Sequence, residues 1–270
     1  MTKIEASFTD VNYLDILSAQ DTPVHRVEPR MMLLTTLAFI LAVMSFDKYA
    51  LAGLVPFVLY PTVLIAAGNL PLAYLARKVL VALPFALLIG AFNPLLDRTV
   101  LVRIGSVGIS GGWISFASLL LRFCLTVTAA VVLVAITGFE GFCRSLERLG
   151  APRAFVVQLL FLYRYLFVLG AEAARMERAR SLRSFGSRGR GLHAFASLLG
   201  QLLLRTLERA RRIHQAMRCR GFDGELRTLQ PRRIGGRDIM FFVGWTALFI
   251  LLRLYDVATL AGTITLRLMR

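Results

Sequence analysis

The chain has 270 residues, of which 57% are hydrophobic, with a mean hydropathy of +0.66 and a net charge of +16 at neutral pH. Water-soluble domains have clearly less apolar content, so this composition excludes an ordinary soluble domain. Uncharged runs account for the excess and cover residues 31–46, 49–76, 79–96, 104–121 and 123–139. A helix needs about 20 mostly apolar residues to cross a bilayer, so the sequence predicts an all-α polytopic membrane protein with about five to six transmembrane helices.

The N-terminal third of the chain is expected to contain a polar arm followed by three spans. The arm, residues 1–30, has no basic region followed by an apolar core, so no cleaved signal peptide is expected. The spans are predicted at about residues 31–46, 49–68 and 79–92. The turns between them are expected to contain Asp47 and Lys48 in the first case, and Asn69, Pro71, Arg77 and Lys78 in the second.

The middle of the chain combines a loop, a fourth span and a short helix. Asn93-Pro94 is expected to break the third span, and residues 99–110 alternate branched apolar residues around Gly105-Ser106, which predicts a small β-hairpin. The fourth span is expected at about residues 113–137. Residues 139–149 then place their apolar side chains on one helical face, which is typical of an interfacial helix, and Gly150 is placed to end it.

Two long helices follow, and both change from apolar to arginine-rich along their length. The first starts near Arg153, becomes charged after Gly170 and ends before Gly186. The second runs from about Leu192 to Arg220, and Gly221 is placed to end it. A final span is expected at residues 239–252, while residues 258–268 either continue it or form a separate half-span.

The positive charge is concentrated around these two helices. Residues 138–233 contain 19 arginines and seven acidic residues, a net charge of +12. Because positively charged loops stay in the cytoplasm, this segment is expected inside, with residues 1–30 and 69–78. Residues 47–48 and 93–112 are then expected outside. The chain is thus expected to consist of an arm with a four-span bundle (1–138), a cytoplasmic region of amphipathic helices (139–235) and a C-terminal membrane segment (236–270).

The motifs of common enzymes and metal sites are absent from the sequence. It has no GxxxxGK[ST] loop to hold phosphates, no GxSxG nucleophile motif and no clustered acid pair. Its three cysteines (Cys124, Cys143 and Cys219) and three histidines (His25, His193 and His214) lack metal-ligand spacing. We therefore expect a non-catalytic protein with no cofactor and no metal site of its own.

The arginines admit more than one interpretation. A run of charge on a helix is often a solvated face, and basic helices also attract anionic lipid. The duplication instead favours docking on a partner with two similar grooves, because the planar guanidinium group pairs well with carboxylates and carbonyl groups. Arg122 and Arg164 lie near or within apolar runs, where they either have a function or extend to the membrane surface.

Several stretches carry a resemblance to a known family, including HRVEPR (25–30), GISGGW (108–113), SLERLGAPRAF (145–155), LYRYLFVLGAEAARMERARSLR (162–183) and LERARRIHQAMRCRGFDGEL (207–226). In these stretches the chain resembles the transmembrane component of energy-coupling-factor (ECF) transporters, the EcfT/CbiQ family. The family's hallmark is an Ala-Arg-Gly motif at the end of each of two cytoplasmic coupling helices. Ala179-Arg180-Ser181 and Cys219-Arg220-Gly221 match this motif with one departure each, and both keep the arginine.

The resemblance implies a coupling subunit of an ATP-driven importer. Its partners would be two ATP-binding cassette subunits (CbiO-type), a substrate-binding membrane subunit (CbiM-type) and a small accessory membrane subunit (CbiN-type), in the cell membrane and without nucleic acid. Cobalt or nickel would be the cargo, as in the CbiQ-type branch; a vitamin such as biotin, or a stand-alone secondary transporter, are the alternatives. The residues implied in ATPase coupling are Ala179, Arg180, Ser181, Arg183, Arg218, Cys219, Arg220 and Gly221.

Overall fold

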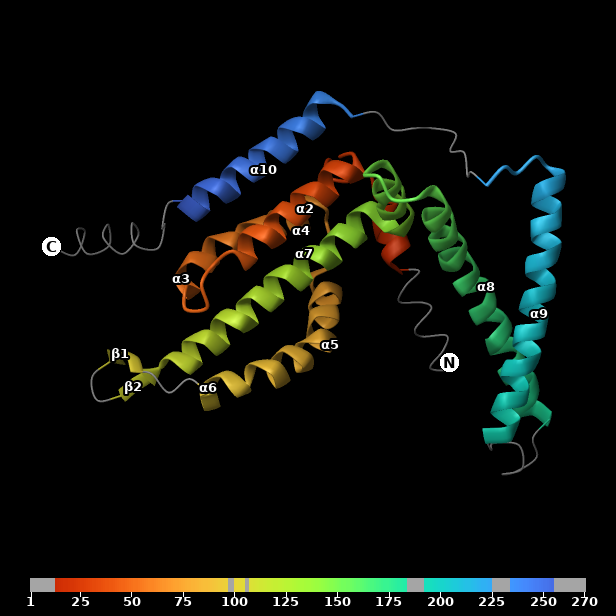
Figure 1. Cartoon of the computed structure of the whole chain (residues 1–270), viewed down its shortest axis with the longest axis horizontal. Helices are drawn as coiled ribbons and strands as arrows, with labels where there is room; N and C mark the ends of the chain where they lie inside the picture. The colour runs from red at the N-terminus through yellow and green to blue at the C-terminus, as the bar shows by residue number, and fades with distance from the viewer. Residues whose placement is uncertain (1–12, 97–99, 105–106, 184–191, 225–233, 255–270) are drawn as a thin grey trace. The chain divides into compact units, whose positions relative to one another are not determined.

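The computed structural model of the chain describes residues 13–96, 100–104, 107–183, 192–224 and 234–254 (Figure 1). The predicted half-span at 258–268 lies outside these residues. The chain divides into two compact units. One contains residues 1–16 and 139–231, and the other contains residues 17–138 and 232–270.

The second unit holds most of the apolar helices. Its elements are α2 (Pro29–Met44), α3 (Leu51–Leu54), the 3-10 helix η1 (Val55–Val58), α4 (Leu59–Ala67), α5 (Leu72–Gly90), α6 (Phe92–Leu96), strands β1 (Val100–Ile104) and β2 (Val107–Ser110), the first part of α7 (Gly111–Arg148), and α10 (Gly236–Leu254). The strands pair antiparallel and form the predicted hairpin. The predicted second span is divided into three pieces at η1, where Pro56 has no backbone N–H to donate.

An aromatic cluster forms the core of this unit, where α10 packs along α2 (Figure 1). Phe39, Phe57 and Tyr60 are each at most 1% exposed. The ring of Phe249 from α10 lies 5.4 Å from that of Phe39 and 5.3 Å from that of Tyr60. Buried aromatic rings contribute the most apolar area per residue, so this cluster joins α2, α4 and α10 into one bundle.

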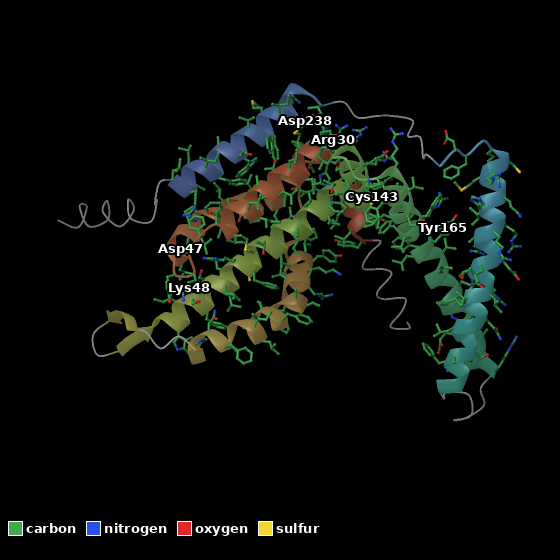
Figure 2. The ribbon with its side chains drawn as sticks, in the orientation of Figure 1. Arg30, Asp47, Lys48, Cys143, Tyr165 and Asp238 are labelled. Atoms are coloured by element: carbon green, nitrogen blue, oxygen red, sulfur yellow. The ribbon has the colours of Figure 1, made fainter. Side chains whose placement is uncertain are left out.

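A pair of buried carboxylates joins the beginnings of α2 and α10. Glu28 caps α2 by accepting a hydrogen bond from the backbone N–H of Arg30 at 2.9 Å, and Pro29 occupies the first helical position, where it has no N–H to lose. The backbone N–H of Glu28 donates in turn to the Asp238 carboxylate at 3.0 Å. Figure 2 shows Asp238 beside Arg30. The HRVEPR stretch is therefore a helix cap tied to the last helix.

Two sequence predictions about α5 and α6 are wrong. Arg77 and Lys78 lie inside α5 and not in a turn, because the turn already ends at Pro71, which follows Asn69 in a left-handed conformation (φ 48°). Asn93-Pro94 lies within α6, and the helix is interrupted at Ala91 instead. Pro94 is tolerated there because the first turn of a helix leaves its N–H groups unpaired in any case.

Helix α7 contains both the predicted fourth span and the predicted interfacial helix, which meet at Gly138. This glycine has φ 66° and ψ 163°, a conformation that is essentially restricted to glycine. A Cβ atom there would lie 2.8 Å from the Ser18 hydroxyl oxygen. Gly150 ends the interfacial part with φ 108°, while the N–H groups of Gly150 and Ala151 bond to Glu147 and Leu146. This pattern is a Schellman cap, as the sequence indicated.

Within the described residues, three helical segments are long and apolar enough to cross a membrane: Leu72–Pro94, Gly111–Arg148 and Arg153–Arg183. Two shorter apolar segments, Pro29–Met44 and Leu51–Ala67, accompany them. The chain is thus an all-α polytopic membrane protein, as predicted from its composition, with one small hairpin outside its helices.

Candidate functional site

The two arginine-rich helices belong to the first unit and form an antiparallel pair. Helix α8 spans Arg153–Arg183 and α9 spans Leu192–Cys219. They contact each other and run in opposite directions (Figure 1). Both agree with the predicted ranges within the described residues, and α9 ends at Gly221 as predicted. Gly186, which was predicted to end the first helix, lies outside the described residues.

An ion pair connects the two helices at the point where each changes from apolar to charged. The Arg205 guanidinium of α9 donates to the Glu172 carboxylate of α8 at 2.8 Å, and Arg175 donates to the other oxygen of the same carboxylate. The Glu172 side chain is only 17% exposed, whereas both arginines are at least 60% exposed. Glu172 thus pairs with both Arg175 and Arg205. Exposed ion pairs add little stability, so we interpret this contact mainly as one that sets the register of the two helices.

The first motif lies in the last turns of α8. Ala179 and Ser181 are exposed and Arg180 is half-buried. The Nη1 atom of Arg180 is buried and has no hydrogen-bond acceptor within the described part of the chain. Ser181 has helical neighbours on both sides, and its hydroxyl donates to the carbonyl of Arg178 at 2.8 Å. Serine is therefore compatible with the helical backbone at this position, because no left-handed conformation that would require glycine occurs there.

The second motif forms the end of α9. Arg218, Cys219 and Arg220 are exposed, and Gly221 has φ 80°. The N–H groups of Gly221 and Phe222 bond to the carbonyl groups of Arg218 and Met217, which makes a Schellman cap. Glycine is thus needed in the second motif to stop the helix, whereas Ser181 in the first motif lies inside one. The two motifs share an arginine but not a backbone conformation.

The predicted site residues form two groups, not one. Arg180 lies eight residues beyond Glu172 in α8, and Arg220 lies fifteen residues beyond Arg205 in α9. Since the helices are antiparallel and rise 1.5 Å per residue, the two arginines lie on opposite sides of the Glu172–Arg205 pair, about 30 Å apart or more. Ala179, Ser181 and Arg183 accompany the first arginine, and Arg218, Cys219 and Gly221 accompany the second. A partner that contacts both groups has to offer two separate binding places.

Both helices also expose apolar side chains beside the charges. Eight of them are 48–75% exposed: Phe155, Leu162, Leu182, Phe195, Leu199, Leu203, Leu204 and Leu207. Five belong to α9, between Phe195 and Leu207, where exposed apolar residues at helical spacing form a face of the helix. Such faces mark sites of association with protein or membrane.

Among the described residues, no group of three or more His, Cys, Asp or Glu side chains is placed to hold a metal ion. Cys124 is half-buried, Cys143 is buried and Cys219 is exposed, and all three are free thiols. The groups that α8 and α9 expose are mainly arginines and apolar side chains.

The family model for the cobalt transport protein CbiQ matches residues 20–230, which is most of the chain. The chain belongs to the CbiQ family. The match contains both arginine-rich helices, the Glu172–Arg205 pair and all of the predicted site residues. The family is named for cobalt transport, and three described helices of the chain are long and apolar enough to cross a membrane.

Named relatives are found at modest identity. The chain is 31% identical over 137 residues to the cobalt transport protein CbiQ of Rhodobacter capsulatus, covering 49% of this chain and 56% of that protein, which is less than two thirds of its length. It is 27% identical over 260 residues to the energy-coupling factor transporter transmembrane protein EcfT of Heliobacterium modesticaldum, covering 88% of this chain and 95% of that protein. A fused cobalt transport protein CbiMQ of Methanocorpusculum labreanum is 32% identical over 80 residues, 29% of this chain and 13% of that protein.

Contacts that sequence reasoning missed hold the first part of α8 in place. The Tyr163 hydroxyl donates to the Asp15 carboxylate at 2.8 Å, and the Tyr163 ring stacks on that of Phe139 at 4.2 Å. Arg164, next to Tyr163, is exposed. Tyr163 and Glu172 are both polar residues within or next to an apolar run. This position in the sequence is the signal that could have marked the two residues as candidates. Their partners are distant in sequence or on another helix, so the contacts themselves had no signal.

Proposed function

We propose that the chain is the transmembrane coupling subunit of an ECF-type importer. In this role it transmits ATP-driven motion of two ATP-binding cassette subunits to a substrate-binding membrane subunit, and it catalyses no reaction itself. The family and the CbiQ and EcfT names of its relatives support this role. Cobalt, or the chemically similar nickel ion, is the proposed cargo, because the family model and two of the relatives are named for cobalt transport.

The observation that carries the proposal is the presence of two separate arginine-bearing helix ends on one pair of contacting helices. Arg180 and Arg220 lie on opposite sides of the ion pair at Glu172, so each can enter the groove of a different ATPase subunit. The buried, unpaired Nη1 atom of Arg180 gains most from a carboxylate or carbonyl acceptor on such a partner. When the ATPases close, the two ends are moved relative to each other, and the helices carry that motion toward the membrane.

The proposed orientation follows from the same residues. ATPase subunits of importers act in the cytoplasm, so the helix ends at Arg180 and Arg220 face that side of the cell membrane. The excess of arginine in residues 138–233 agrees with this orientation. The partners would be CbiO-type ATPases, a CbiM-type substrate-binding subunit and a CbiN-type accessory subunit. The CbiMQ relative, whose name joins CbiM and CbiQ in one chain, supports a CbiM-type partner.

Co-purification in detergent tests the proposal. The chain would be co-expressed with the CbiO-type ATPases as wild type, as Arg180→Glu with Arg220→Glu, and as Arg211→Glu with Arg212→Glu. The last variant is a matched control, because both of its arginines are exposed on α9 and lie outside the motifs. We expect the ATPases to be lost from the first variant and retained by the control. Equal retention by both variants, with both folded in the membrane, would contradict the proposed docking sites.

A further inference from the structure

A cavity of about 550 Å³ lies in the second unit, between the end of α2, α5, α6 and α7. Both polar and apolar side chains line it. The polar ones are Lys48, Asn93, Ser115, Ser118, Arg122 and Thr126. The arrangement depends on close packing of α5 against α7, because Gly90 has no side chain and a Cβ atom there would lie 2.8 Å from the Phe116 ring.

The rest of the lining is apolar, and some of its side chains are exposed. It contains Phe85, Ile89, Leu119 and Phe123. Phe85 and Ile89 on α5 are 73% and 62% exposed. The segment Leu72–Pro94 is long and apolar enough to cross a membrane. In a bilayer its exposed apolar side chains would meet the hydrocarbon phase, from which a lipid chain would reach the cavity.

The polar part of the wall is positively charged. Arg122 donates through Nη2 to the backbone carbonyl of Asp47, while its Nε is buried and has no acceptor within the described residues. Lys48 comes from the same turn, as Figure 2 shows, and none of the described lining residues is acidic. The acid of this turn is Asp47, which is exposed and does not line the cavity, although its charge acts on Arg122. Arg253 of α10 approaches the turn from another side and donates to the carbonyl of Ser45 at 2.9 Å.

We propose that this cavity binds an anionic phospholipid. Its phosphate lies against Lys48 and Arg122 and accepts a hydrogen bond from the Nε–H of Arg122. Its acyl chain lies along Phe85, Ile89 and the apolar side chains of α7. A cationic pocket beside an apolar groove within a membrane bundle has the chemistry of a lipid headgroup site. A purely apolar occupant would leave the unpaired donor of Arg122 buried, which is costly.

Native mass spectrometry of the full chain, delipidated in detergent, tests the proposal. Phosphatidylglycerol is compared with phosphatidylcholine that carries the same acyl chains. Removing one cation from a lipid headgroup site weakens binding by about fivefold, which corresponds to about 1 kcal/mol. We therefore expect Arg122→Gln and Lys48→Gln each to lower the affinity for phosphatidylglycerol about fivefold, with little effect on phosphatidylcholine. Arg77→Gln, which removes an exposed charge of α5 outside the cavity, should change neither.

A second variant and a competition with inorganic phosphate complete the experiment. Lys48 is an exposed turn residue, so Lys48→Gln remains informative if Arg122→Gln disturbs the fold. Inorganic phosphate at millimolar concentration should leave bound phosphatidylglycerol in place, because it cannot use the apolar wall. The proposal is overturned if Arg77→Gln weakens binding as much as Lys48→Gln does, if both lipids bind equally, if inorganic phosphate displaces the lipid, or if a substrate-binding membrane subunit is found seated in the cavity.

Discussion

The link between α10 and the beginning of α2 provides a quantitative test of the fold. The Asp238 carboxylate accepts hydrogen bonds from the backbone N–H groups of Glu28 at 3.0 Å and Gly235 at 2.8 Å. Asp238 and Glu28 are 8% and 1% exposed, so water cannot replace the acceptor that the N–H of Glu28 would lose, whereas Gly235 is exposed. A buried unpaired N–H costs about 1–3 kcal/mol, and a lost helix cap costs about 1 kcal/mol. Asp238→Ala should therefore lower the free energy of unfolding by about 2–4 kcal/mol.

Trp245 of α10 is a suitable reporter for this experiment. Its ring lies 5.0 Å from that of Tyr60 and 5.9 Å from that of Phe249, inside the aromatic cluster. In a Trp113→Phe background it is the remaining tryptophan, since the chain has two, and its fluorescence follows unfolding in mixed micelles with increasing SDS. Arg237→Ala, an exposed neighbour, is the matched control. A result for Asp238→Ala within about 0.5 kcal/mol of this control would refute the reasoning, because ordinary surface substitutions fall in that range.

Two further predictions concern the same unit. Gly138→Ala should lower the free energy of unfolding by about 1–3 kcal/mol, because alanine is strained in the backbone conformation of this glycine. Gly244→Ala is the control and should be neutral or stabilising, because Gly244 is a helical glycine with open space around it. SDS titration compares the two variants, and equal effects would contradict the assigned role of Gly138. Burial lowers the pKa of His25, so its neutral form favours the fold: the stabilisation is present above the unfolded pKa of about 6.5 and is lost as the pH falls below it. The thermal midpoint of the wild type should fall as the pH is lowered from 8 to 5, and that of His25→Gln should fall less. The same pH dependence in both proteins would contradict the role assigned to His25.

The parts of the fold that could be predicted are those with a local physical signal. Gly150 and Gly221 mark the ends of helices, and both adopt positive φ. The change from apolar to charged residues in α8 and α9 predicted both helices and their approximate bounds. The beginning of α5 was missed because Arg77 and Lys78 suggested a turn, although charged residues on an exposed helical face are equally acceptable.

The residues of the candidate site could be predicted from the sequence, but their arrangement in space could not. Arg180 and Arg220 stand out in the sequence because similar short motifs surround them. Their separation along an antiparallel pair depends on the contact between Glu172 and Arg205, which lie 33 residues apart. The contrast between Ser181 inside a helix and Gly221 at a helix end is likewise visible only once the backbone is known.

Site-specific photo-crosslinking tests the central claim most directly. A photoreactive amino acid would replace Ser181 or Cys219, the exposed neighbours of the two arginines, in the full chain co-expressed with its ATPase partners. Arg211, exposed on α9 but outside the motifs, is the control position. The account predicts efficient crosslinks to an ATPase subunit from both motif positions and much weaker ones from the control. Crosslinks to lipid alone at both motif positions would contradict the claim that these helix ends dock on the ATPases.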